Sequence, residues 1–167
     1  MNSVLVMIFD KLQKTIIILF FLYFNVNVYG AETDKLLTGT IMASSNLSSA
    51  SKAFDDDPST YFTSVNSTRQ WVGLDLGSPH VITRISYTPS AVYNGPDCML
   101  LSLFEGGNDP NFMDAVPLYF ISGKPKAKTE TTVYVNVSRG IRYIRYVGGA
   151  GSYCKVAELK FYGYEGE

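Results

Sequence analysis

The chain has 167 residues, of which 14 are Lys or Arg and 15 are Asp or Glu, so its formal net charge at pH 7 is −1. Neither sign dominates, and Arg139, Arg142 and Arg145 are spread along a strand-like segment rather than gathered in a basic stripe. This charge pattern argues against a nucleic-acid-binding protein and gives no support for attraction to an anionic membrane surface.

Residues 1–30 have the pattern of a secretory signal peptide. Lys11 and Lys14 precede the apolar run 15–24, and a small-residue cleavage site follows at 28–30. Because the run is shorter than the ~20 residues of a membrane span, a retained anchor is only the alternative. We therefore predict a secreted protein in which residues 31–167 form a single domain, since no linker or internal repeat divides them.

An acidic run stands early in this domain, at Lys52-Ala-Phe-Asp-Asp-Asp-Pro-Ser-Thr60. Asp55 and Asp57 are two residues apart and Thr60 follows three later, a spacing that suits a loop wrapping Ca²⁺ with oxygen ligands. The same residues also suit a solvated turn, in which Asp57 or Ser59 caps a short helical turn. An EF-hand is excluded, because Thr60 stands where the sharp-turn glycine belongs.

The rest of the domain is rich in β-branched and aromatic residues punctuated by Gly, Pro, Asn and Ser, which is typical of strands. Two of the segments alternate in polarity as half-buried antiparallel strands do, and no window of helical period competes with them. The sequence predicts an all-β fold, a sandwich, with strands near 70–76, 81–88, 98–105, 116–122, 131–138, 141–147 and 155–163.

The cysteines and three asparagines of the chain predict covalent modifications. Cys98 and Cys154 are the two cysteines of the chain, and in a secreted protein they most simply form one disulfide, with free thiols or an intermolecular bridge as alternatives. Three Asn-X-Ser/Thr sequons predict glycosylation sites on the surface, at Asn46, Asn66 and Asn136.

The sequence gives little material for catalysis. His80, the one histidine, stands beside a proline in a predicted turn, where we expect it to be solvated. Asp75 lies between two leucines, where a lone carboxylate is expected to be a hydrogen-bonded structural group. Trp71, the one tryptophan, opens a strand and is expected in the core. No pair of carboxylates is spaced to face across a cleft, so we predict a protein that is not an enzyme.

Six blocks in a fixed order carry a family resemblance: residues 50–62, 70–77, 81–89, 104–108, 143–146 and 156–163. Between about Thr40 and Gly163 the chain resembles the discoidin, or coagulation factor 5/8 type C, domain family. This resemblance implies a jelly-roll β-sandwich of the galactose-binding-like type, similar to family 32 carbohydrate-binding modules. Such domains occur in secreted lectins, in modules attached to glycosidases, and in adhesion or membrane-docking proteins.

The resemblance also implies a complete structural Ca²⁺ site. In lectin-like members an Ala-Glu pair at the start of the last strand closes the acidic loop, and here that pair is Ala157-Glu158. Seven oxygens would then fall within the coordination range of Ca²⁺. They are the Lys52 carbonyl, the Asp55 carboxylate, a group from Asp57, the carbonyl and hydroxyl of Thr60, the Ala157 carbonyl and the Glu158 carboxylate.

Sugar recognition needs an aromatic face and a few planar hydrogen-bonding groups. The predicted loops at one end of the sandwich offer both, and the predicted ligand-binding residues are Tyr61, Arg69, Tyr93, Asn94 and Tyr153. Galactose-binding members usually carry two arginines where this chain has Ser90 and Cys98. The loss of both arginines argues against galactose itself and leaves open another glycan read by Tyr, Asn and Arg69.

We thus predict a secreted, non-catalytic, lectin-like module that binds glycans or glycoconjugates and carries structural calcium. The alternative is an adhesion module for a protein or phospholipid surface, and a structural protein without a ligand is a third hypothesis. The segment Ala91–Tyr93 is the one apolar loop tip in the sequence, because Met99 and Leu100 are expected to be buried in a strand. No feature of the sequence indicates an oligomeric state.

Overall fold

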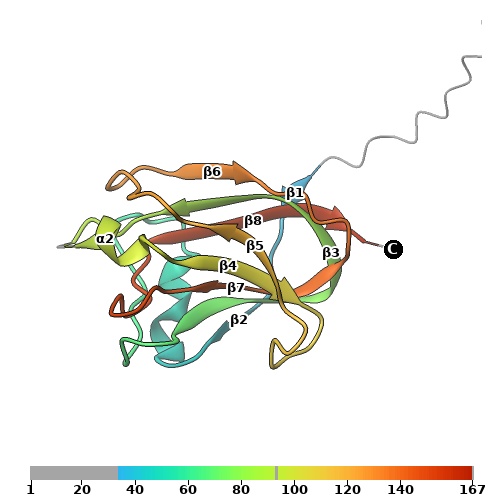
Figure 1. The fold of residues 1–167 in the computed structure, drawn as a ribbon, viewed down its shortest axis with the longest axis horizontal. Coiled ribbons are helices and arrows are strands. Elements are labelled where there is room, and N and C mark those ends of the chain that lie inside the picture. The colour runs from blue at the N-terminus through green and yellow to red at the C-terminus, as the bar shows by residue number, and fades with distance from the viewer. Residues whose placement is uncertain (1–33, 93, 167) are drawn as a thin grey trace, which may run out of the picture. The chain divides into compact units, whose positions relative to one another are not determined.

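A single long strand, β3 (Trp71–Thr88), organises the fold (Figure 1). The computed structural model describes residues 34–92 and 94–166. β3 has 18 residues, and its pairing with β7 shifts register between Asp75 and His80. Gly77 in this interval has φ 82°, a conformation that favours glycine. The predicted strands 70–76 and 81–88 are therefore the two halves of one bent strand.

The bend places the halves of β3 in different layers of a β-sandwich. The first half pairs antiparallel with β2 (Thr40–Ala43) and β7 (Ile141–Val147), and β7 continues through β4 (Leu103–Gly107) to β5 (Val116–Phe120). The second half pairs with β6 (Thr131–Tyr134) and β8 (Glu158–Glu165), and β8 pairs with β1 (Lys35–Leu36). The protein is an all-β jelly-roll sandwich, as predicted.

The hydrophobic core lies between the two layers. Phe62, Phe104, Tyr146 and Phe161 are fully buried in it. The ring centroid of Phe104 lies 5.3 Å from that of Tyr146 and 6.2 Å from that of Phe161, distances at which aromatic pairs contribute beyond their buried area. Large buried side chains at inward positions of both layers therefore hold the sandwich together.

Two short helices were not predicted. The 3₁₀ helix η1 (Leu47–Ala53) precedes the acidic run. Helix α2 (Gly95–Met99) occupies the start of the predicted strand 98–105, which begins only at Leu103. That prediction was wrong because Pro96 in the first turn of α2 favours a helix start. Met99 is buried as expected, although it lies in this helix rather than in a strand.

Two residue-level predictions need correction and one is confirmed. Trp71 is outside the core cluster, and its ring packs 5.3 Å from that of Phe112. His80 is only 8% exposed and its Nδ1 lies 2.8 Å from the Ser78 carbonyl oxygen, so the bend of β3 buries it rather than leaving it solvated. Asp75 is confirmed as a structural group, since both its oxygens accept from Arg142 at 2.8 and 3.1 Å.

The predicted disulfide is not formed in the structure, where Cys98 and Cys154 are free. Cys154 is fully buried, and its thiol donates to the Tyr146 carbonyl at 3.7 Å. Burial raises the pKa of Cys154 to about 12. Cys98 lies half-buried on α2 instead of on a strand. Counting cysteines predicts a pair, but only the direction of the two side chains decides whether they can bond.

Three connecting segments meet at one end of the sandwich, which we call the loop end: residues 54–70, 89–102 and 148–157. The amide of Ser64 donates to the Tyr153 carbonyl at 2.8 Å and that of Gly151 to the Ser67 carbonyl at 2.9 Å. The amide of Gly149 donates to Ser102 Oγ at 3.0 Å. Helix α2 lies at this end, on the left in Figure 1.

Among the described residues, no helix is long and apolar enough to span a bilayer.

Candidate functional site

The acidic run Lys52–Thr60, here called the metal loop, turns its oxygen atoms toward one another. Thr60 Oγ1 donates to Asp55 Oδ2 at 2.8 Å, and it lies 3.4 Å from the carbonyl oxygens of Lys52 and Asp57. The turn that brings them together is closed by the Thr60 amide, which donates to the Asp57 carbonyl at 3.0 Å. Four oxygen donors of the predicted set therefore converge without any residue from the rest of the chain.

Glu158, the first residue of β8, brings a buried carboxylate to the metal loop. The residue is 4% exposed, and its Oε2 accepts from the amide of Asp56 at 3.2 Å. Its other oxygen, Oε1, is buried with no hydrogen-bond partner among the described residues. Burial, together with the neighbouring Asp55 carboxyl, raises the pKa of Glu158 to about 7. A buried acceptor without a donor, beside a second carboxylate, is the arrangement that a cation satisfies.

The three consecutive aspartates of the metal loop have three different roles. Asp55 faces Thr60; burial opposes its ionisation, but hydrogen bonds from Thr60 and from the Asp57 amide lower its pKa overall. Asp56 has φ 62° and forms an ion pair with Lys160 at 2.7 Å. Asp57 accepts from the amide and hydroxyl of Ser59 at 2.9 and 2.6 Å. Asp57 thus caps the turn with one side-chain oxygen, and its carbonyl oxygen faces Thr60 Oγ1.

The donor set of the metal loop fits a hard cation. Its side-chain donors are two carboxylates and one hydroxyl, and its remaining donors are carbonyls, all of them oxygens of the kind that Ca²⁺ takes. Within residues 34–92 and 94–166, no three His, Cys, Asp or Glu side chains form a group that could hold a metal. The metal loop is not such a group, because only two of its predicted ligands are carboxylates and most of the others are carbonyls. The residues that would hold Ca²⁺ are Lys52, Asp55, Asp57, Thr60, Ala157 and Glu158.

A polar hollow of about 340 Å³ lies beside the metal loop, between η1 and the residues that follow the loop. Tyr61 is its one aromatic lining residue. Asn46 fixes one wall, because its Nδ2 donates to the Thr63 carbonyl at 2.7 Å. One ammonium group, one amide and several hydroxyls surround the space. The residues that line this polar hollow are Asn46, Ser49, Lys52, Ser59, Thr60, Tyr61 and Thr63.

The structure brings only some of the predicted ligand-binding residues together. Tyr61 lines the polar hollow, and Thr63 Oγ1, also in its lining, donates to the Tyr153 carbonyl at 3.5 Å. The side chain of Tyr153 is 48% exposed on the last loop. Arg69 and Asn94 are exposed residues with left-handed backbones, and neither lines the hollow. Tyr93 and the predicted signal peptide lie outside the described residues.

Lys155 is a site residue that the sequence did not reveal. Its Nζ lies 5.9 Å from the centroid of the Tyr61 ring. The antiparallel bridge between Phe62 and Val156 produces this contact, since it sets residue 155 beside the segment that carries Tyr61. No sequence motif marks the position, because the two residues are more than ninety positions apart. Asn66 and Asn136 of the predicted sequons are exposed, whereas Asn46 is half-buried.

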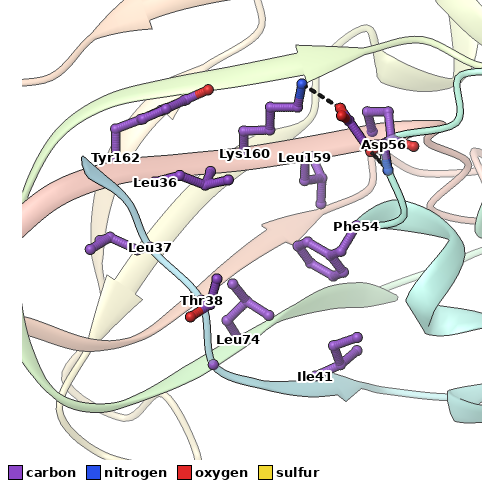
Figure 2. A pocket seen from close by; sticks show the side chains of 12 residues that line it. Leu36, Leu37, Thr38, Ile41, Phe54, Asp56, Leu74, Leu159, Lys160 and Tyr162 are labelled. Atoms are coloured by element: carbon purple, nitrogen blue, oxygen red, sulfur yellow. Dashed lines mark hydrogen bonds and ion pairs between the residues drawn. The ribbon is translucent and has the colours of Figure 1, made fainter. Parts of the chain in front are cut away.

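A second cavity, of about 330 Å³, opens between β8 and the segment that joins β1 to β2 (Figure 2). Leu36, Ile41, Phe54 and Leu74 give it a mainly aliphatic lining, and the Lys160–Asp56 ion pair lies at its rim. Thr38, Asp56, Glu158, Lys160 and Tyr162 supply the polar groups of this cavity. We take the polar hollow as the candidate ligand site, because every side chain of its lining can form hydrogen bonds around one aromatic ring.

Comparison with known proteins agrees with this geometry. The family model described as the F5/8 type C domain matches residues 39–159. The chain belongs to the F5/8 type C domain family. This F5/8 type C domain is similar to the solved structure of CBM62 from Clostridium thermocellum Xyl5A, with 36% identity and a TM-score of 0.74. The match covers 80% of this chain and 99% of that module. Comparison with curated proteins found no match.

Two more distant structures share the fold of this F5/8 type C domain. A fucolectin from Morone saxatilis (striped bass) serum is 20% identical with a TM-score of 0.68, covering 78% of this chain and 47% of the lectin. A chitosan-binding module from a chitosanase/glucanase of Paenibacillus sp. IK-5 is 22% identical with a TM-score of 0.57, covering 76% of this chain and 96% of the module. The architecture is thus that of carbohydrate-binding modules and lectins.

Proposed function

We propose that this F5/8 type C domain is a secreted, non-catalytic module that binds a glycan in the polar hollow. The observation that carries the proposal is the lining of the hollow, in which one aromatic ring, that of Tyr61, is surrounded by hydroxyl and amide side chains. An aromatic face against the apolar side of a sugar ring, with polar groups around it, is the chemistry that sugar recognition requires. The likeness to carbohydrate-binding modules and a fucolectin supports the same role.

We further propose that Ca²⁺ in the metal loop is structural. The donors named above leave a cation held by protein groups on all sides, with no open position for a reacting ligand. The cation would join the metal loop to the start of β8, because Glu158 carries one of the two carboxylates. It would also hold the polar hollow in shape, since Lys52 and Thr60 belong to both.

The test is binding of the protein, expressed with its N-terminal segment, to a glycan array with Ca²⁺ and with excess chelator. We expect saturable binding to a subset of glycans that chelator weakens through loss of structure. The substitution Tyr61→Ala should weaken the array signal while leaving the folded protein monodisperse. Recovery from the culture medium of a chain that begins near Ala31 would support secretion, and a chain retained in cells at full length would contradict it.

A second function has one specific observation in its favour. Val65, Val92 and Leu101 are exposed apolar residues on different segments of the loop end, with exposed fractions of 68%, 37% and 61%. Apolar residues at loop tips are suited to contact with a phospholipid surface. Saturable binding to anionic liposomes that is lost in Val65→Ser with Leu101→Ser, together with a blank glycan array, would favour this function over glycan binding.

A further inference from the structure

One lysine lines the polar hollow and a second approaches its aromatic ring. Lys52 is the only charged residue of its lining. Lys155 approaches the same aromatic ring, with Nζ 5.9 Å from the Tyr61 centroid, and it is only half-exposed, which limits the positions that its ammonium can take. Two cations therefore lie close to the one ring that can stack on a sugar.

Neither cation has an acidic partner in the described part of the chain. Within residues 34–92 and 94–166, no carboxylate lies within 4.0 Å of Lys52 Nζ or Lys155 Nζ, whereas six other cations of that part of the chain form ion pairs. The nearby acids of the metal loop are already engaged, since Asp55 faces Thr60 and Asp57 accepts from Ser59. A ligand anion would find no competing carboxylate on the lining of the hollow.

The positive charge is local to this site. Residues 31–167 carry 12 basic and 14 acidic side chains, so a general attraction to polyanions is not expected from the domain as a whole. Two unpaired lysines beside a polar, aromatic hollow, on a domain with a slight excess of acid, are a specific complement to a single negative group. This complementarity selects among ligands rather than simply attracting them.

The position where galactose-binding members carry an arginine is closed in this structure. Ser90 is fully buried, and its Oγ accepts from the amide of Val92 at 3.3 Å. It therefore cannot present a planar donor to neutral ring hydroxyls. The remaining strong donors near the proposed site are the ammonium groups of Lys52 and Lys155, which act as point charges and suit a carboxylate or sulfate oxygen.

We infer that the polar hollow takes an acidic sugar, with its ring against Tyr61 and its anionic group between Lys52 and Lys155. This inference rests on the proposed glycan-binding function and adds the class of ligand. The hydroxyls of Ser59 and Thr63 and the amide of Asn46 are left for the neutral hydroxyls of the sugar. The shared chemistry is one negative group on a pyranose, supplied either by a uronate or by a sulfate ester.

Isothermal titration with trigalacturonate and its fully methyl-esterified form, at fixed Ca²⁺, isolates the carboxylates, because the two probes share one backbone. We expect the acid to bind at least tenfold more tightly than the ester, since one charge-assisted hydrogen bond contributes about 1.5–3 kcal/mol and about 1.4 kcal/mol is a factor of ten. A parallel titration with a 6-sulfated and an unsulfated galactose oligomer distinguishes sulfate from carboxylate as the preferred anion.

Variants assign the preference to the two lysines. Lys52→Gln and Lys155→Gln should each weaken binding of the preferred anionic probe about tenfold and leave the neutral probe unaffected. Lys35→Gln, which removes the same charge from exposed β1, should change neither. Lys52→Arg and Lys155→Arg keep the charge and should retain most of the preference, and equal melting temperatures across the set exclude unfolding.

Equal affinity for acid and ester and for sulfated and unsulfated probes, or a preference that survives both glutamine substitutions, would overturn the inference while the proposed function stands. Binding confined to neutral glycans on the array would have the same meaning. A glycan array on which the parent protein itself gives no signal would instead overturn the proposed function, and the inference with it.

Discussion

The metal loop and the polar hollow are neighbours that share Lys52 and Thr60, but they differ in how their groups are brought together. In the metal loop, carboxylates, carbonyls and one hydroxyl turn toward one another, and most of them come from nine consecutive residues. The hollow is lined by residues of η1 and of segment 59–63, and Lys155 of the last loop approaches its aromatic ring. A site built from consecutive residues can be recognised in the sequence. A site built from separate segments can be recognised only when the structure shows which loops lie together.

Removal of calcium is expected to have the largest effect, and it tests whether the metal loop is a cation site at all. At a Ca²⁺ concentration of ~100 times Kd, binding to the folded state alone adds about 2.7 kcal/mol to the free energy of unfolding. Excess chelator should therefore lower Tm by roughly 10 °C for a domain of this size. Scanning calorimetry with and without chelator measures this shift, and an unchanged Tm would contradict a structural cation.

The buried carboxylate of Glu158 should make the calcium-free protein less stable as pH rises. Its pKa of about 7 in the folded state lies above the ordinary 4.5, so between about pH 4.5 and 7 the folded state holds a proton that the unfolded state has lost. The free energy of unfolding then falls by about 3 kcal/mol across this window. Denaturant titrations of the calcium-free protein at several pH values measure it.

The matched variant for this second effect is Glu158→Gln. It should flatten the pH dependence, stabilise the calcium-free protein near pH 7, and remove the stabilisation by Ca²⁺. A variant that kept the slope of the parent between pH 4.5 and 7 would assign the effect to another group. Asp55 is not a candidate, because its pKa is lowered and its contribution is lost only at more acidic pH.

Substitutions of half-buried Tyr61 and exposed Tyr153 should distinguish the hollow from the last loop as the ligand site. Tyr61→Ala is expected to weaken glycan binding about 3- to 10-fold through loss of the aromatic face, and Tyr61→Phe should retain it. Tyr153→Ala should change affinity by less than a factor of two, because Tyr153 does not line the hollow. If titration calorimetry gives the reverse order, the ligand binds on the last loop and the hollow is not the site.

The smallest effect is expected at Asp56. Its side chain is 80% exposed in the ion pair with Lys160, and exposed pairs contribute about 0.2–1 kcal/mol. Asp56→Asn should lower stability by no more than this, since Asn tolerates the positive φ, and should leave the calcium affinity unchanged. A large loss of calcium affinity in Asp56→Asn would place this carboxylate, rather than that of Asp55, among the cation ligands.

Much of the fold was predictable because its information is local. Alternating apolar residues gave the strands, and the six family blocks gave the jelly roll. The failures have equally local causes: Gly77 joins two predicted strands into one, and Pro96 starts a helix where residue types alone favoured a strand. Trp71 was placed in the core because it opens a strand, but it lies outside the core cluster and its ring packs against Phe112.

The sequence by itself determined the family and the β-sandwich, since six ordered blocks carry those signals, and calcium in the metal loop stays a prediction. Only the tertiary structure decided which aspartate does what, because backbone φ and turn bonds set the direction of each side chain. It alone brought Lys155 to Tyr61 and left the two cysteines free. Direction and proximity across more than ninety residues come from strand pairing, which residue spacing does not encode.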